Sequence, residues 1–197
     1  MNSRYRHPRH RSIPLATAPG PTTTTTWKID PTHSDVEFAV KHLMITTVKG
    51  RFSDVEGEIV IVPGNPSAST VSATIKAASI DTRAGQRDDH LRSADFLHAE
   101  SFPEITFRST RITGDGSSFK VIGDLTIRGT TREVILDATN EGSTKDPWGG
   151  ERIAFTATTK IDRRDFGLVW NQAIESGGVM VGTEVKISIE IQAVKQA

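Results

Sequence analysis

Residues 33–62 alternate between apolar and other side chains, and this alternation limits the fold more than any other feature of the sequence. Val36, Phe38 and Val40 alternate with Glu37, Ala39 and Lys41, two of which are charged. A period of two places successive side chains on opposite faces of a β-strand. The same alternation returns in at least five later segments. The chain is therefore predicted to form one curled sheet with an apolar inner face.

Eight segments have the length and alternation of β-strands. They are residues 34–42, 48–62, 70–80, 104–112, 118–128, 132–140, 151–162 and 183–194, preceded by a short strand at 27–29. Glycine-containing stretches at 113–117 and 129–130 predict hairpins, and Asn140-Glu141-Gly142 predicts a longer loop that ends at 148–150. Connections this short require antiparallel neighbours.

Closure of the sheet would remove its two exposed edges. We therefore expect an all-β fold, an eight-stranded antiparallel β-barrel. A barrel of this size is either filled by its own side chains or holds one small ligand. Residues 81–103 depart from the β pattern and predict a short helical insert over one barrel end.

Composition separates the chain into two parts and excludes several classes. Residues 1–26 contain four arginines, no acidic residue, and a run of prolines and threonines, which predicts a disordered tail before one domain at 27–197. That domain carries 20 basic against 24 acidic residues, which gives no footprint for nucleic acid. No stretch is apolar for long enough to span a membrane. The tail lacks the apolar run of a signal peptide, so we expect a cytoplasmic protein.

Five motifs in order resemble one known family. They are Asp30-Pro31-Thr32-His33-Ser34 with Gly50-Arg51-Phe52; Arg87-Asp88-Asp89-His90-Leu91; Phe102-Pro103-Glu104-Ile105-Thr106-Phe107; Gly123-Asp124-Leu125-Thr126-Ile127-Arg128-Gly129; and Asp162-Arg163-Arg164-Asp165-Phe166-Gly167. Together they resemble the YceI-like family of lipid-binding proteins over residues 27–194. The resemblance implies a lipocalin-like barrel with an apolar pore, a polyprenyl or quinone-like isoprenoid ligand, and no cofactor.

The predicted ligand-binding residues fall into two groups. Inward-facing positions on the strands, together with the turn at 165–167, supply the tail contacts Phe38, Val40, Phe52, Phe107, Leu125, Ile127, Phe155 and Phe166. A polar head group needs donors or a cation, and the candidates are His42, Arg87, His90 and Arg163. Trp170 begins a glycine-containing segment that could cover the pore as a lid.

Other interpretations of the same residues stay open at this point. The apolar side chains could form a solid core, with a protein partner bound outside. His90, Asp88 and Arg87 could form an acid–base site acting on a lipid head group, although no nucleophile elbow is present. The spacing of His33, His42 and His90 matches no metal-ligand pattern, so no metal is expected. A homodimer through one mouth or an outer strand is also open.

Overall fold

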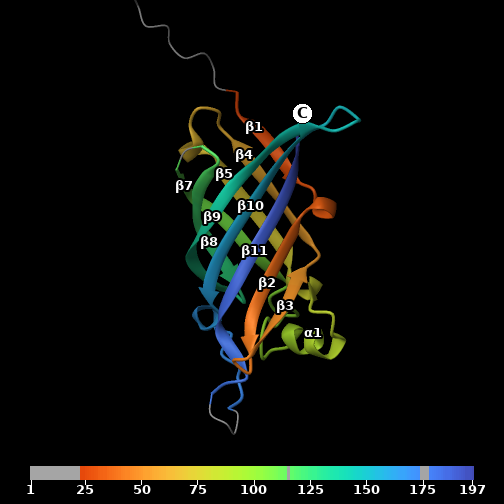
Figure 1. The fold of residues 1–197 in the computed structure, drawn as a ribbon, viewed down its shortest axis with the longest axis vertical. Coiled ribbons are helices and arrows are strands. Elements are labelled where there is room, and N and C mark those ends of the chain that lie inside the picture. Colours follow the sequence, from red (N-terminus) through yellow and green to blue (C-terminus); the bar gives the residue numbers. More distant parts are fainter. Residues whose placement is uncertain (1–22, 115, 174–177) are drawn as a thin grey trace, which may run out of the picture.

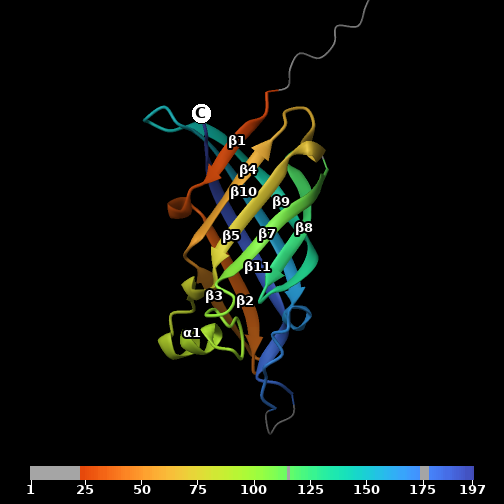
Figure 2. The same ribbon diagram turned by 180° about the vertical axis from the view of Figure 1, so that it is seen from behind.

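The described residues of this computed structural model, 23–114, 116–173 and 178–197, form an antiparallel sheet of eleven strands with one α-helix (Figures 1 and 2). The strands and the helix are β1 Thr25–Ile29, β2 Asp35–His42, β3 Thr46–Phe52, β4 Val55–Ile61, β5 Thr70–Lys76, β6 Ile80–Asp81, α1 Gly85–Arg92, β7 Glu104–Thr113, β8 Ser118–Ile127, β9 Thr130–Lys145, β10 Glu151–Asp162 and β11 Val181–Lys195.

These strands occupy eight positions around a closed barrel. β2 pairs with residues 181–190 of β11, and β1 pairs with residues 193–195 of the same strand, so β1 and β2 share one position. β3 pairs with β2 and β4 pairs with β1, so β3 and β4 share the next position. β5 and β6 share the third, and β7 to β11 supply the remaining five. The predicted eight-stranded antiparallel barrel is confirmed.

The segment predicted as one strand at 48–62 is two strands, and so is the segment predicted at 70–80. β3 ends at Phe52 and β4 begins at Val55, while a short 3₁₀ helix, Ala77–Ser79, separates β5 from β6. The two breaks lie opposite each other, because Ser53 N donates to Ser79 O at 3.3 Å. Because both neighbouring strands are interrupted at the same height along the barrel, the sheet can bend sharply there.

The predicted hairpins at 113–117 and 129–130 are present between β7, β8 and β9. Arg128 and Gly129 both have positive φ, at 49° and 71°, which suits the tight turn between β8 and β9. The longer loop predicted from residue 140 is wrong. β9 continues to Lys145, and Glu141 is an extra residue opposite the step from Ala154 to Phe155, a β-bulge. A bulge interrupts the alternation in the same way as a loop would.

The ends of the domain differ slightly from the predicted bounds. Thr25 and Thr26 pair with β4, so two residues assigned to the tail belong to the barrel. Of the rest of the predicted disordered tail, residues 1–22 lie outside the described residues. The predicted helical insert is present as α1, which lies beside the lower end of the barrel in Figure 1. No helix of the described part is both long and apolar enough to cross a membrane.

Candidate ligand-binding cavity

The interior of the barrel is hollow along its middle. In β11 the inward-facing Ile187, Ile189 and Ile191 are only half-buried, although strands surround them on every side. Side chains that face a packed core would lose nearly all their accessible surface. The surface that these isoleucines retain faces a cavity of 470 Å³. The interpretation of a solid core is therefore wrong for the middle of the barrel.

The cavity wall is made of apolar side chains from all eight positions of the barrel. Nine of the predicted residues line it: Phe38, Val40, Phe52, Phe107, Leu125, Ile127, Phe155, Arg163 and Phe166. Alternation along each strand directs these side chains inward. A cavity of this volume lies within the range of small-molecule sites.

One end of the cavity is closed by packed side chains. Phe96, Leu97, Phe166 and Leu168 line the cavity and are each at least nine-tenths buried. Leu97, Phe166 and Leu168 also belong to the largest core cluster, which includes Ile127. These residues come from the connections after α1 and after β10, so the helical insert and the segment that follows β10 close this end.

The opposite end of the cavity reaches the surface. Its lining there includes Pro63 and Gly64, between β4 and β5, and Gly114, between β7 and β8, all of them exposed. Polar residues lie on the same half of the lining, namely Ser69 and Asn140. The structure therefore places the mouth at the end of the barrel opposite α1.

Arg163 is a lining residue whose charged group is already occupied. It is 4% exposed, and its guanidinium donates from Nε to Gly182 O at 2.9 Å and from Nη2 to Val181 O at 3.3 Å. Nη1 donates to Leu168 O. Burial lowers the pKa of this guanidinium. Arg163 thus joins the start of β11 to the segment after β10 at the closed end, because backbone carbonyls there need donors.

Four predicted ligand-binding residues lie outside the cavity lining: His42, Arg87, His90 and Trp170. Arg87 donates from Nε to Thr82 Oγ1 and from Nη2 to Thr82 O, each at 2.7 Å. Asp88 Oδ1 accepts from the backbone N of Thr82 at 2.9 Å. Arg87 and Asp88 therefore hold α1 against the loop before it, and neither lines the cavity.

His90 and Trp170 form a contact at the closed end. The His90 ring meets the Trp170 ring edge-on, with centroids 4.7 Å apart, and also meets Phe96 at 5.0 Å. His90 Nε2 lies 2.9 Å from Asp95 Oδ2. The predicted lid is tied to α1 through Trp170, away from the mouth, and part of it, residues 174–177, lies outside the described residues.

Two of the three histidines considered as a metal site pair with different carboxylates. His33 Nδ1 lies 2.9 Å from Asp30 Oδ2, whereas His90 pairs with Asp95. Within residues 23–114, 116–173 and 178–197, no three His, Cys, Asp or Glu side chains gather in a metal-binding arrangement.

Sequence reasoning missed much of the wall. The residues not singled out include Ile59, Val71, Ala73, Leu136, Ala157, Ile187 and Ile189. The alternation that identified Phe38 and Val40 as inward-facing is equally clear in β11. The same alternation therefore indicates the inward-facing residues of the other strands. The residues of the mouth follow from no periodicity, because loops place them.

The chain is similar in sequence and in structure to proteins of one known family. The model of the YceI-like domain family matches residues 27–193. Protein YceI of Shigella flexneri is 38% identical over 164 residues, which cover 83% of each chain. The crystal structure of a Campylobacter jejuni YCEI protein is similar with a TM-score of 0.68 at 34% identity, over 80% of this chain and 90% of that one. A polyisoprenoid binding domain from Saccharophagus degradans shares the fold, with a TM-score of 0.61 at 15% identity over 86% and 98% of the two chains.

Proposed function

Because the chain belongs to the YceI-like family, we propose that its barrel binds and sequesters an amphiphilic lipid with an isoprenoid tail, of the polyprenyl or quinone-like class. The observation that carries this proposal is the apolar cavity of 470 Å³ that runs along the barrel axis. A related fold described as a polyisoprenoid binding domain supports the choice of ligand class.

The tail supplies most of the binding free energy in this proposal. Each buried CH₂ group contributes about 0.8 kcal/mol, so several prenyl units contribute on the order of 10 kcal/mol before costs. Ordering a flexible tail and losing translational freedom take back a large part of that gain. Phe38, Phe107 and Phe155 offer rigid apolar surface, which limits the additional ordering cost on the protein side.

We propose that the polar head group lies at the mouth, near Ser69 and Asn140. The sequence instead predicted His42, Arg87, His90 and Arg163 as the residues that contact the head group at the mouth. The residues at the insert end are paired with the protein itself, as Arg87 is with Thr82. The mouth, by contrast, opens to solvent, where a head group keeps its hydration.

Binding without catalysis is the simplest activity for this arrangement. The candidate acid–base residues Arg87, Asp88 and His90 do not line the cavity, so a lipid inside the barrel would not meet them. We therefore propose a carrier, and we test it through binding.

The test is native mass spectrometry of the full chain purified from bacterial cells without detergent, followed by solvent extraction. The expected result is a bound hydrophobic compound that is released by the solvent. The emptied protein should then bind a fluorescent polyprenol saturably, with one site per chain. An empty protein that also fails to bind the polyprenol would contradict the proposal.

A further inference from the structure

We propose that the closed end of the barrel, the end remote from the mouth, docks on the surface of an anionic lipid bilayer. The docking surface consists of an apolar tip, Met44, Ile45, Val169 and Val179, and a row of lysines above it, Lys49, Lys160 and Lys186. This inference goes beyond the proposed function, because it does not depend on what the cavity holds.

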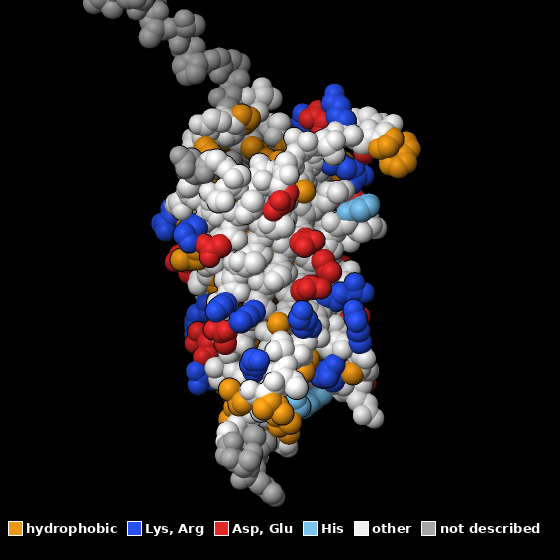
Figure 3. Space-filling view, in the orientation of Figure 1, with side chains coloured by type: hydrophobic (Ala, Val, Ile, Leu, Met, Phe, Trp, Pro, Cys, Tyr) orange, Lys and Arg blue, Asp and Glu red, His pale blue; other side chains and the backbone are white. Residues whose placement is uncertain are grey.

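Large apolar side chains are exposed together at this tip. Ile45 is 78% exposed, Val169 67%, Met44 57% and Val179 37%. The β2–β3 turn and the chain before β11 are joined here, since Leu43 N donates to Met180 O at 2.8 Å. Figure 3 shows hydrophobic side chains gathered at the lower end of the molecule. Exposed apolar groups that gather in one place mark interaction sites.

The β2–β3 turn has an unfavourable sequence for its conformation. Ile45 N donates to His42 O, and the two central residues, Leu43 and Met44, have φ values of 50° and 62°. A turn with two left-handed residues is normally made by Asn-Gly or Gly-Gly, which adopt positive φ readily. Strained backbone of this kind tends to occur at functional sites. Here it keeps a large apolar side chain, Met44, at the tip.

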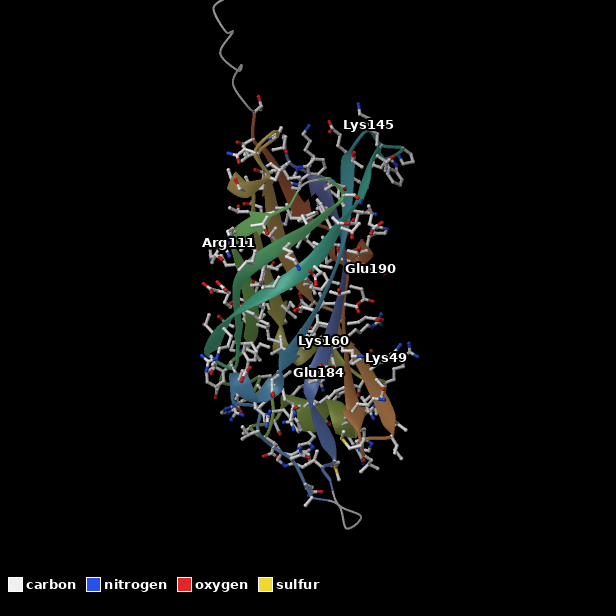
Figure 4. All side chains as sticks on the ribbon, turned by 60° about the vertical axis from the view of Figure 1, so that its left-hand side comes forward. Lys49, Arg111, Lys145, Lys160, Glu184 and Glu190 are labelled. Atoms are coloured by element: carbon white, nitrogen blue, oxygen red, sulfur yellow. The ribbon has the colours of Figure 1, made fainter. Side chains whose placement is uncertain are left out.

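Lysines form a row on the outer surface above the tip, with Asp162 and Glu184 at the next outward position toward the tip on β10 and β11. Lys160 of β10 lies opposite Lys186 of β11, Lys186 lies opposite Ala39 of β2, and Ala39 lies opposite Lys49 of β3. Period-two alternation turns all of these side chains outward. In Figure 4, Lys49 and Lys160 lie just below the middle of the molecule, Glu184 lies below Lys160, and Lys145 lies at the upper end. Lys160 is 3.7 Å from Glu184, and both side chains are more than half exposed.

This combination fits a bilayer better than a second copy of the chain. Apolar side chains of a tip insert at the boundary between head groups and acyl chains, while lysines a few residues away face anionic head groups. A two-fold symmetric dimer through the same tip would bring the lysine row of one protomer toward that of its partner. Like charges brought toward each other oppose association at low ionic strength.

The test measures co-sedimentation of the full chain with vesicles of phosphatidylcholine alone and with vesicles that also contain phosphatidylglycerol. The parent chain should bind the anionic vesicles and should be released by salt. All variants keep the same N-terminal residues, so differences between them report on the barrel.

Two variants of the docking surface should reduce binding in different ways. Met44→Gly with Ile45→Thr should lower partitioning to anionic vesicles by about tenfold or more, because two inserted side chains are lost. Its melting temperature should not fall, since glycine relieves the left-handed strain at position 44. Lys49→Glu with Lys186→Glu should also lower partitioning to anionic vesicles by about tenfold or more at low salt. High salt should remove this difference from the parent chain.

The matched control changes the same kinds of residue at the mouth end. Trp148 is 87% exposed in the β9–β10 turn, and Lys145 lies close to it in the chain. Trp148→Ser with Lys145→Glu should change vesicle binding by less than about twofold. The proposal is overturned if the parent does not bind vesicles, if only the control loses binding, or if sedimentation shows that the tip variants dissociate a dimer.

Discussion

Phe38 and Gly50 lie directly opposite each other on β2 and β3, and the phenylalanine ring covers the glycine. A Cβ atom at position 50 would be 2.4 Å from Cζ of Phe38. The Phe107 ring covers Gly123 on the neighbouring strand as a diagonal neighbour, and a Cβ at position 123 would be 2.6 Å from its Cζ. Glycine thus gives each ring room to lie along the wall, and both rings line the cavity without filling it.

Gly50→Ala should displace the Phe38 ring from its place on the wall. We expect a loss of about 1–3 kcal/mol in the free energy of unfolding, because a methyl group is forced into packed atoms. Polyprenol affinity should fall as well, since the displaced ring takes up cavity volume. Urea unfolding and polyprenol titration measure the two effects. Gly85→Ala is the control, because nothing lies within 4 Å of a Cβ there; a similar loss of stability in both variants would contradict the explanation.

Ala157→Phe should fill the cavity while leaving the fold intact. Ala157 lines the cavity in β10 beside Phe155, and an added ring would occupy space that the ligand needs. We expect polyprenol affinity to fall by about tenfold or more, with little change in the melting temperature. Thr158→Phe places the same ring on the exposed outer side of β10 and should bind normally. Equal affinities for the two variants would place the ligand outside the barrel.

His90→Ala separates a carrier from a catalyst. His90 contacts Trp170 and Phe96 outside the cavity lining, so the variant should lose about 0.5–1.5 kcal/mol of stability from the aromatic contacts. Polyprenol affinity should change by less than about twofold. Mass spectrometry of lipid incubated with each protein measures turnover. A lipid product formed by the parent chain and absent with the variant would favour the enzyme hypothesis.

The stability of the barrel should fall in acid because of a cluster beside the β1–β11 contact. Arg152 donates to Asp30 Oδ2 at 2.7 Å and to Asp146 Oδ2 at 3.0 Å. Hydrogen bonds from Thr32 and Arg152 hold the pKa of Asp30 well below its usual value, and Arg152 lowers the pKa of Asp146. Carboxyl groups with lowered folded-state pKa values stabilise the protein fully above a pH of about 4. That stabilisation is lost as the pH falls toward the folded-state values.

Urea unfolding of Arg152→Met at a series of pH values measures this contribution. The midpoint should be lower than that of the parent at neutral pH, and its decrease between a pH of about 4 and about 2 should be smaller. Lys160→Met is the control, because the Lys160–Glu184 pair is exposed and should contribute little. An unchanged acid dependence in Arg152→Met would show that other carboxyl groups govern acid unfolding.

Much of the fold could be predicted because alternation is a local property of the chain. The inward positions of Phe38, Phe107 and Phe155 follow from period two, and eight segments of that kind favour closure. The breaks at Ser53 and Ala77 were missed, because a bend in a continuous apolar pattern depends on what the neighbouring strand does at the same level. The sequence predicts a loop where the bulge at Glu141 lies, since a bulge and a loop both interrupt the alternation.

The sequence by itself determined which side chains face inward and that the sheet is antiparallel, because both depend on residues close together in the chain. Only the tertiary structure decided that the middle is hollow, since that depends on how far apart opposite walls stand. It also decided that Arg163 donates to carbonyls of distant segments and that the mouth lies away from His90. These facts follow from contacts between residues far apart in the chain, and no local pattern encodes them.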